Sequence, residues 1–336
     1  MRQDRRLLEV NNLSTYFYLD EGVVKAVDDV SFFVNRGETL GVVGESGCGK
    51  SVTALSIMQL VAKPRGKIEH GEIIYYGHQA EPIEITSLES HGRRMRAIRG
   101  NEIAMIFQEP MVSLNPVYAI GEQIVEAVRT HQTASKRRAR ERALEMLERV
   151  RIAAPERCLA LHPHELSGGM RQRVMIAMAL SCNPSLLIAD EPTTALDVTI
   201  EAQILDLIYE LKSDFKTAVM FITHDLKVIG DMADRVIVLY AGKVVESALV
   251  DEIFYNPKHP YTQGLLESIP QIGRAKRLVP ITGTVPGLTD LPKGCYFEPR
   301  CPTSLETCRT EQPPSFGAEA AHEVKCWLYE KEQVVI

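Results

Sequence analysis

Residues 44–51 read Gly44-Glu45-Ser46-Gly47-Cys48-Gly49-Lys50-Ser51, which fits the phosphate-loop pattern of two glycines separated by four residues and followed by Lys and Ser. Glycine lets the backbone curl, so that several N–H groups converge on a polyanion. A helix that begins after the loop adds its positive N-terminal end. We expect Lys50 to contact the β- and γ-phosphates and the Ser51 hydroxyl to bind Mg²⁺. The stretch therefore predicts a site for a nucleoside triphosphate and magnesium.

Short apolar runs alternate with helix-like segments around this loop. The runs 38–43, 103–107, 186–189 and 218–223 each lead into polar residues, as buried parallel strands do. Residues 52–61 and 199–211 have helical spacing, with Ile200, Ile204, Ile208 and Leu211 on one face. This alternation predicts an α/β fold with a mainly parallel core sheet.

The composition of the sequence changes twice along the chain. The stretch from about 93 to 168 is rich in charge and helical signal, whereas prolines and glycines crowd 257–314. We therefore predict a nucleotide-binding domain over 1–245, with a helical subdomain at about 93–168, and an irregular C-terminal extension over 246–336.

Composition and charge limit the classes of function. A net charge of −6 over 336 residues argues against a duplex-DNA surface. The basic cluster at 136–142 is interpreted as the solvated face of a helix that begins near Ser135, since Ala139, Ala143, Leu147 and Val150 recur at helical spacing. No apolar run has the length of a membrane span and no secretory signal is visible, so we expect a cytosolic protein unless a partner holds it at a membrane.

A second strand supplies carboxylates. Asp190 and Glu191 directly follow the apolar run 186–189. We expect Asp190 to hold Mg²⁺ through its water shell, and Glu191, just beyond the strand, to polarise an attacking water as a general base.

Leu166-Ser167-Gly168-Gly169-Met170-Arg171-Gln172-Arg173 resembles the signature motif of ABC ATPases, a subclass of P-loop NTPases, and precedes the Asp-Glu strand as in that family. Ser167 and two glycines at the start of a helix suit a phosphate group. The resemblance implies that Ser167, Gly168 and Gly169 cover the nucleotide of a second ATPase subunit. The ATP site is then composite, and no arginine finger is needed.

Other family elements follow in sequence order. Gln108 resembles the glutamine that senses Mg²⁺ and the attacking water, and His224 resembles the histidine that contacts the γ-phosphate. Thr194-Ala195-Leu196-Asp197 resembles the loop that crosses the dimer seam, with Thr194 in place of the more usual serine. Among three consecutive aromatics we prefer Phe17 as the residue that stacks on adenine. Each is weak alone, because such residues are more often structural.

Two segments resemble the ATPase subunits of oligopeptide and dipeptide importers. They are Gln108-Glu109-Pro110-Met111 through Ser113-Leu114-Asn115-Pro116, and Asn256-Pro257-Lys258-His259-Pro260-Tyr261-Thr262. The resemblance implies a peripheral protein at the cytoplasmic face of the membrane. Its expected partners are a second ATPase subunit (as a heterodimer), two transmembrane permease subunits and, indirectly, an extracytoplasmic solute-binding protein, with no nucleic acid. Nickel, glutathione and oligosaccharides remain alternative solutes. A soluble ABC ATPase acting on nucleic acid is the alternative of another class, and a non-hydrolysing regulator is disfavoured by Glu191 and His224.

Four of the seven cysteines lie in the C-terminal extension, namely Cys295, Cys301, Cys308 and Cys326. Four thiolates suit a [4Fe-4S] cluster or structural zinc. Zinc sites more often use Cys-x-x-Cys turns, which are missing here, and some members of the importer group resemble this pattern and carry a cluster. We therefore expect a [4Fe-4S] cluster, with zinc, free thiols or a redox disulfide as alternatives. His162 and His164 are interpreted as parts of a loop before the signature helix.

Overall fold

The computed structural model describes residues 5–77, 81–108, 113–132, 134–194, 196–269, 280–317 and 322–334, with no side-chain account beyond 330. The chain forms two compact units, each assembled from separate stretches. The helical unit contains 1–8, 34–38 and 75–221, and the phosphate-loop unit contains 9–33, 39–74 and 222–336.

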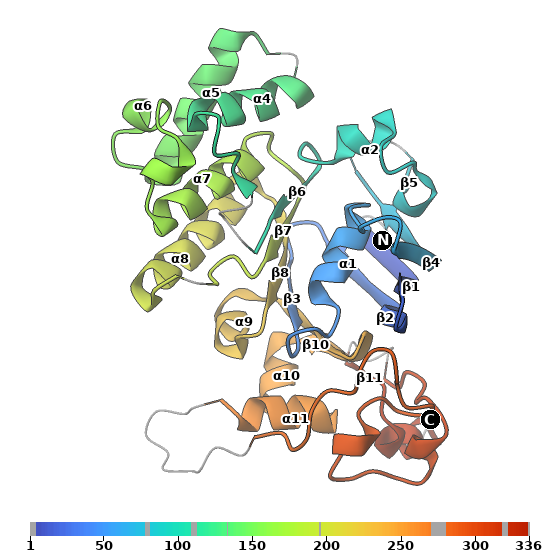
Figure 1. The fold of residues 1–336 in the computed structure, drawn as a ribbon. Helices are drawn as coiled ribbons and strands as arrows, with labels where there is room; N and C mark the ends of the chain where they lie inside the picture. Colours follow the sequence, from blue (N-terminus) through green and yellow to red (C-terminus); the bar gives the residue numbers. More distant parts are fainter. Residues whose placement is uncertain are drawn as a thin grey trace. The chain divides into compact units, whose positions relative to one another are not determined.

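Strands and helices alternate as predicted (Figure 1). The strands are β1 Arg6–Leu19, β2 Gly22–Asn35, β3 Thr39–Val43, β4 Gly66–Tyr75, β5 Ile83–Glu84, β6 Ile103–Ile106, β7 Leu186–Asp190, β8 Ala218–Thr223, β9 Arg235–Tyr240, β10 Lys243–Leu249 and β11 Glu323–Val324. The α-helices are α1 Lys50–Ile57, α2 Arg93–Ile98, α4 Ile120–His131, α5 Lys136–Arg149, α6 Pro155–Cys158, α7 Gly168–Leu180, α8 Val198–Phe215, α9 Leu226–Met232, α10 Val250–Tyr255 and α11 Pro260–Glu267. The 3₁₀ turns are η2 Ile85–Ser87, η3 Pro163–Glu165, η4 Glu298–Arg300, η5 Thr307–Arg309 and η7 Trp327–Val334.

The helical unit combines parallel strands with a packed helical layer. β6 pairs in parallel with β7, with Ile106 opposite Ala189, so the carboxyl ends of both strands lie at the same edge. All five residues of β7 are buried, as expected for a strand covered on both faces. Helices α4, α5 and α7 pack on one another (Figure 1).

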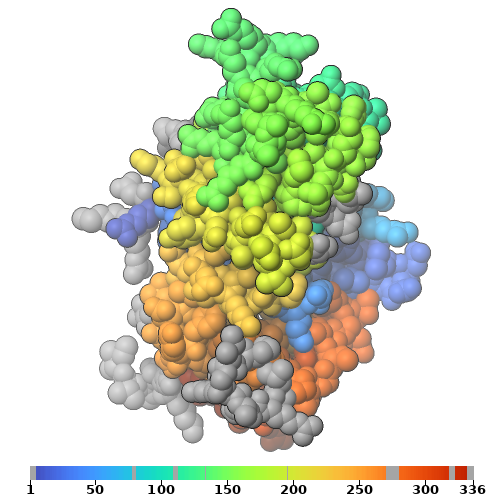
Figure 2. Space-filling model, turned by 90° about the vertical axis from the view of Figure 1, so that its left-hand side faces the viewer, coloured from blue at the N-terminus to red at the C-terminus, as the bar shows by residue number. Residues whose placement is uncertain are grey.

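Helix α5 confirms the interpretation of the basic cluster. Ser135 caps it by accepting a hydrogen bond from the Arg138 N–H at 3.3 Å, while Ala139, Ala143 and Leu147 are buried and most of the charged residues face solvent. Helices α5 (green) and α8 (yellow) form part of the surface in Figure 2. Exposed ion pairs on such a surface contribute about 0–1 kcal/mol each.

The phosphate-loop unit contains β3, β9, β10, β11 and most of β1, β2 and β4. β3 and β9 are parallel, whereas β9, β10 and the short β11 are antiparallel. The predicted helix after the phosphate loop is shorter than 52–61 suggested: α1 ends at Ile57, because Gln59 adopts a left-handed φ of 52°. In the C-terminal extension, short helices and 3₁₀ turns replace regular periodicity, as predicted.

No described helix combines the length and apolar character that crossing a bilayer requires. The predicted boundary between a nucleotide-binding domain and an extension at 245/246, and the limits of the helical subdomain, remain predictions.

Candidate nucleotide site and its C-terminal support

The phosphate loop connects the end of β3 to the start of α1. Gly44 and Gly49 have φ of 155° and 101°, so both lie in the region that favours glycine. A Cβ on Gly44 would lie 2.2 Å from the Leu239 carbonyl oxygen, and a Cβ on Gly49 would lie 2.2 Å from the Ala26 carbonyl oxygen. Neighbouring backbone therefore requires glycine at both positions.

The lysine of the loop is buried and held by the loop itself. Lys50 Nζ donates to the carbonyl oxygens of Gly44 at 2.8 Å and Glu45 at 3.1 Å. The N-cap of α1 is Gly49, which has no side chain of its own to cap the helix. Ser46 and Gly47, at the tip of the loop, are exposed, and Cys48 is buried, which raises the pKa of its thiol. A cationic group thus lies beside a helix N-terminus, which is an arrangement suited to phosphate.

The three consecutive aromatics of β1 divide between the two faces of the strand. The Tyr16 hydroxyl donates to Asp28 Oδ1 at 2.7 Å, and the Tyr18 hydroxyl donates to Glu69 Oε1 at 2.6 Å. Phe17 alternates with them and is half-buried. Unlike Tyr16 and Tyr18, Phe17 has no hydroxyl, so a base that stacks on its ring disturbs no hydrogen bond of that side chain.

The strand ends of the helical unit bring two predicted residues together. Gln108 Nε2 donates to Glu191 Oε2 at 3.1 Å, and Thr194 Oγ1 donates to the same oxygen at 3.1 Å. Asp190, the last residue of β7, is buried at 4% exposure, whereas Glu191 is half-buried with a left-handed φ of 45°. The two successive carboxylates therefore differ in their exposure to solvent.

The predicted signature segment forms the start of α7. Ser167 is its N-cap, and its Oγ accepts from the Met170 N–H at 3.3 Å. Ser167 and Gly168 are exposed. A Cβ on Gly169 would lie 2.9 Å from Ile200 Cγ2, so α8 packs closely there. An exposed hydroxyl at the N-terminus of a 13-residue helix is available to an external phosphate.

The loop 194–197 leads into α8. Asp197 caps this helix by accepting from the Ile200 N–H at 3.0 Å, and it remains exposed. Ile204, Ile208 and Leu211 are buried on the predicted face, while Ile200 is half-buried. Ala195 of this loop, and Glu109, Pro110 and Met111 of the importer-like segment, lie outside the described residues.

His224 directly follows β8 and is exposed. It lines a cavity of about 270 Å³ together with Asp225, Lys227 and Ser268. Its position at the carboxyl end of a buried strand is the one predicted from sequence.

The four predicted cysteine ligands all lie in the phosphate-loop unit. Cys308 and Cys326 are buried, and Cys295 and Cys301 are half-buried. Burial raises the pKa of Cys295 to about 11 and of Cys326 to about 12, and the other thiols of the set raise both further. The set therefore lies within mutual electrostatic reach. Among the described residues, however, no three His, Cys, Asp or Glu side chains converge to metal-binding distance.

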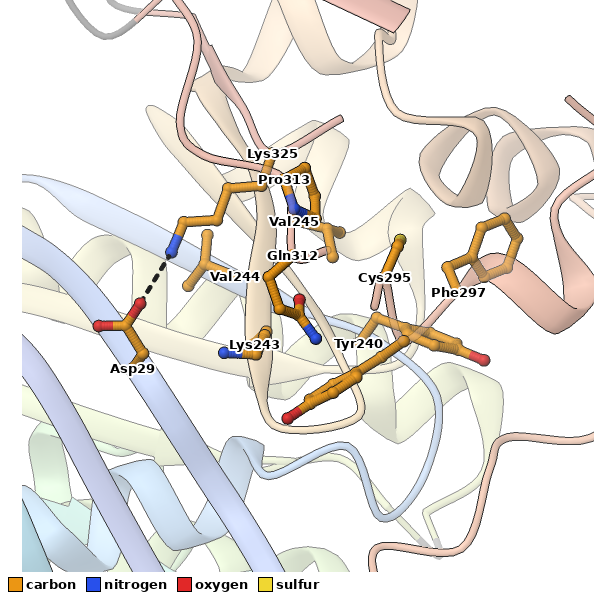
Figure 3. A pocket seen from close by; sticks show the side chains of 11 residues that line it. Asp29, Tyr240, Lys243, Val244, Val245, Cys295, Phe297, Gln312, Pro313 and Lys325 are labelled. Atoms are coloured by element: carbon orange, nitrogen blue, oxygen red, sulfur yellow. Dashed lines mark ion pairs between the residues drawn. The ribbon is translucent and has the colours of Figure 1, made fainter. Parts of the chain in front are cut away.

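A small cavity of about 50 Å³ opens beside Cys295 (Figure 3). Tyr240, Phe297 and Gln312 line it, and Lys325 Nζ lies 3.7 Å from Asp29 Oδ2 at its margin. His162, the N-cap of η3, and His164, within η3, stack on each other with ring centroids 5.7 Å apart, as in a structural loop.

Sequence reasoning missed the residues that support the phosphate loop from the C-terminal extension. Arg300 forms an ion pair with the Glu45 carboxylate, and the Tyr261 hydroxyl accepts from the Glu45 N–H. Tyr261 belongs to the importer-like segment 256–262, but nothing in that segment indicates its partner. The contacts join residues 216 and 255 positions apart.

Together, a phosphate loop at the end of β3, an Asp-Glu pair at the end of β7 and a Ser-Gly-Gly cap on α7 define an ATPase of the ABC class. Comparison with known proteins supports this assignment. Residues 27–194 match the family described as ABC transporter, and residues 245–308 match the one described as Oligopeptide/dipeptide transporter, C-terminal region.

Three relatives are similar over almost their whole length. The chain is 53% identical to the Oligopeptide transport ATP-binding protein AppD of Bacillus subtilis, covering 97% of this chain and 98% of AppD. It is 50% identical to OppD of the same organism (96% and 89% covered) and 47% identical to the Dipeptide transport ATP-binding protein DppD of Haemophilus influenzae (97% and 97% covered). The chain therefore belongs to the ABC transporter family, as an ATP-binding subunit of the oligopeptide/dipeptide group.

A solved structure confirms the fold. The chain matches the dimeric, ADP- and Pi-bound ATP-binding cassette MJ0796 with a TM-score of 0.63 and 29% identity, covering 72% of this chain and 98% of that one. The chain is accordingly an ABC ATPase with a mainly parallel core sheet.

Proposed function

We propose that this chain hydrolyses Mg-ATP to energise import of oligopeptides or dipeptides, at a site that a second ATPase subunit completes. The observation that carries the proposal is the Gln108–Glu191 hydrogen bond of 3.1 Å at adjoining strand ends, because it orients the proposed base. Similarity to peptide-transport proteins along the whole chain, C-terminal region included, supports peptides as the solute.

The phosphate-loop residues 44–51 bind and orient the triphosphate. Lys50 exchanges its hydrogen bonds to the loop carbonyls for bonds to the β- and γ-phosphates, and the backbone N–H groups at the start of α1 face the same oxygens. Phe17 stacks on the adenine. Positioning and electrostatic stabilisation account for most of the rate enhancement in phosphoryl transfer.

Hydroxyl, amide and carboxylate oxygens suit Mg²⁺, and Ser51, Gln108 and Asp190 would hold it. The ion neutralises charge on the transferred phosphoryl group when bound. Glu191 accepts the proton of the attacking water, Gln108 orients that carboxylate, and His224 contacts the γ-phosphate. Asp190, buried at the end of β7, does not act as the base in this proposal.

Ser167, Gly168 and Gly169 act on the nucleotide of the partner subunit, and Asp197 lies at the seam. The exposure of Ser167 and Gly168 at the start of α7 supports a role toward another chain. The other proposed partners are two permease subunits in the membrane, served by a solute-binding protein outside. The chain then works at the cytoplasmic face of the membrane.

Glu191→Gln tests the catalytic assignment. The amide keeps the shape and the hydrogen bond to Gln108 but cannot accept a proton, so turnover by the assembled transporter should fall at least about 10²-fold while Mg-ATP affinity is retained. Thr194→Val, which removes the hydrogen bond from Thr194 to Glu191 and leaves the base, is the matched control and should lose far less. Near-normal hydrolysis by Glu191→Gln would refute the role of Glu191.

Peptide-stimulated ATPase activity in proteoliposomes tests the solute class, with nickel, glutathione and oligosaccharides as competing stimulants.

For the C-terminal extension we propose a [4Fe-4S] cluster held by Cys295, Cys301, Cys308 and Cys326. Four thiols without a carboxylate or histidine among them suit iron–sulfur or zinc and not magnesium. Such a cluster would cross-link the irregular extension, and electron transfer is the chemistry that it can supply.

Metal analysis of anaerobically purified protein distinguishes the alternatives. Iron and acid-labile sulfide in equal amounts, lost in Cys301→Ser but retained in Cys182→Ser, are the expected result. Cys182 is the matched control because it is a buried cysteine in the helical unit. Colourless protein with stoichiometric zinc would overturn the cluster.

A further inference from the structure

Glu45 places a negative charge in the loop that must bind a polyanion. Its side chain is 31% exposed, so water screens it only partly. Left alone, this carboxylate would repel a triphosphate bound by the adjoining residues. A phosphate loop that contains this residue therefore benefits from a cation that neutralises it without competing for the nucleotide.

Arg300 provides that cation. Its Nη1 lies 2.7 Å from Glu45 Oε2 and its Nη2 lies 3.1 Å from Glu45 Oε1, which is the two-point geometry that only a guanidinium can offer a carboxylate. The Arg300 side chain is only 4% exposed. Its Nε donates to the Thr282 carbonyl at 3.0 Å, and its Nη1 lies 3.4 Å from the Tyr240 hydroxyl. All three nitrogens of the guanidinium are thus held by hydrogen bonds within the protein.

A second contact from the same region holds the main chain of Glu45. The Tyr261 hydroxyl accepts from the Glu45 N–H at 3.0 Å. Tyr261 is completely buried and packs against Tyr240 and Phe297, with ring centroids 4.6 and 5.4 Å apart. Residues of the C-terminal extension therefore form hydrogen bonds with both the backbone and the side chain of Glu45 in the phosphate loop.

Hydrogen bonds made by the segment 256–262 hold Tyr261 in this position. His259 caps α11 by accepting from the Tyr261 N–H at 3.0 Å, and Pro260 occupies the first turn. Glu246 accepts from the N–H groups of Lys258 at 2.7 Å and His259 at 2.9 Å. These bonds fix the start of the helix that aims Tyr261 at the loop.

We propose that Arg300, with Tyr261, is a positioning residue for nucleotide binding: it neutralises Glu45 and holds the phosphate loop in the shape that accepts Mg-ATP. Arg300 acts through Glu45 and does not touch the nucleotide. Because Arg300 is bonded directly to Cys301, the turn that carries it belongs to the cysteine-containing segment. The extension is thereby part of the ATP site's construction and not only an appendage. This inference rests on the proposed function.

The test measures Mg-ATP affinity of the full-length chain by isothermal titration, and KM and kcat for ATP in the assembled transporter. Arg300→Met removes the charge and keeps much of the length. It should weaken Mg-ATP binding and raise KM about tenfold, the factor that about 1.4 kcal/mol of repulsion produces, with a smaller change in kcat. Arg300→Lys, which keeps the charge but loses the two-point geometry, should lie between Arg300→Met and the wild type. Arg309→Met is the matched control, because Arg309 is 71% exposed and pairs only with Glu298 among the described residues.

The double variant Arg300→Met/Glu45→Gln separates charge neutralisation from mere structural support. Removing the unpaired Glu45 carboxylate should restore most of the affinity for Mg-ATP. If the pair had only a structural role, the double variant would bind Mg-ATP no more tightly than Arg300→Met. The defect of Arg300→Met should also shrink as salt is raised, because salt screens the repulsion. Wild-type affinity in Arg300→Met, or no recovery in the double variant, would overturn the inference. Failure of the wild-type chain itself to bind Mg-ATP would instead refute the proposed function.

Discussion

Acidification should destabilise the C-terminal extension through one buried histidine. His259 is 1% exposed, its ring lies 5.7 Å from Phe297, and its Nδ1 must be unprotonated to accept from the Tyr261 N–H. Burial accordingly lowers the pKa of His259 from 6.5 to about 3. Protonation would cost both desolvation of an imidazolium and the helix cap.

The sign and size of the effect follow from proton linkage. Between pH 3 and pH 6.5 the unfolded chain binds a proton at His259 that the folded chain does not, so stability falls as the pH falls. From pH 7 to pH 5 this residue alone should reduce the free energy of unfolding by about 2 kcal/mol.

The single tryptophan of the chain, Trp327, offers a local probe because it packs against Phe316 at 6.2 Å in the same extension. Urea unfolding is followed by Trp327 fluorescence at pH 7 and pH 5, in the wild type and in His259→Asn. Asparagine cannot titrate but can accept the same cap hydrogen bond. The variant should be less stable at pH 7, since it leaves a cavity, but should lose about 2 kcal/mol less than the wild type on acidification.

All other ionisable groups are the same in both chains, so they cancel in the difference. An identical loss of stability between pH 7 and pH 5 in the two proteins would refute the reasoning. It would mean that His259 is not the group that binds the additional proton on unfolding.

Three further substitutions test separate parts of the molecule. Gly49→Ala should lose at least about 2 kcal/mol of stability and all measurable Mg-ATP binding, because its Cβ would collide with the Ala26 carbonyl; normal binding would contradict this geometry. Tyr296→Phe deletes the 2.6 Å hydrogen bond from the Tyr296 hydroxyl to Asp28. Burial alone would raise the pKa of Asp28, but hydrogen bonds to its carboxylate outweigh burial and lower that pKa. The variant should lose about 1.5–3 kcal/mol at pH 7 and progressively less as acid protonates Asp28, so a pH-independent loss in urea titrations would argue otherwise. Ser167→Ala should cost about 1 kcal/mol as a lost N-cap. It should leave Mg-ATP affinity of the isolated chain unchanged while ATP-driven pairing, measured by light scattering, and hydrolysis both fall; unaltered pairing would speak against a composite site.

Several parts of the site were predictable because each lies within one short stretch of chain. The loop glycines, Lys50 and Ser51 lie within residues 44–51, and the pattern itself encodes the turn and the helix that follows. The Asp190–Glu191 pair needed only the recognition that a buried strand ends there. In α5, the spacing of buried alanine and leucine between charges predicted the helix and its solvated face.

Other features depend on long-range packing that no local pattern encodes. The end of α1 at Ile57 is decided by the left-handed turn at Gln59 that follows it, although apolar spacing continues beyond. The hydrogen bond between Gln108 and Glu191 requires β6 and β7 to pair in one register.

The sequence by itself determined that this chain is an ABC ATPase with a C-terminal extension, since those motifs are contiguous and their chemistry is local. Only the tertiary structure decided what the extension does for the loop. Arg300 and Tyr261 meet Glu45 across 255 and 216 positions, and such contacts arise when folding stacks distant segments around one buried aromatic cluster. A charge pair of this kind leaves no periodicity or spacing in the chain, because its partners are chosen by proximity in space.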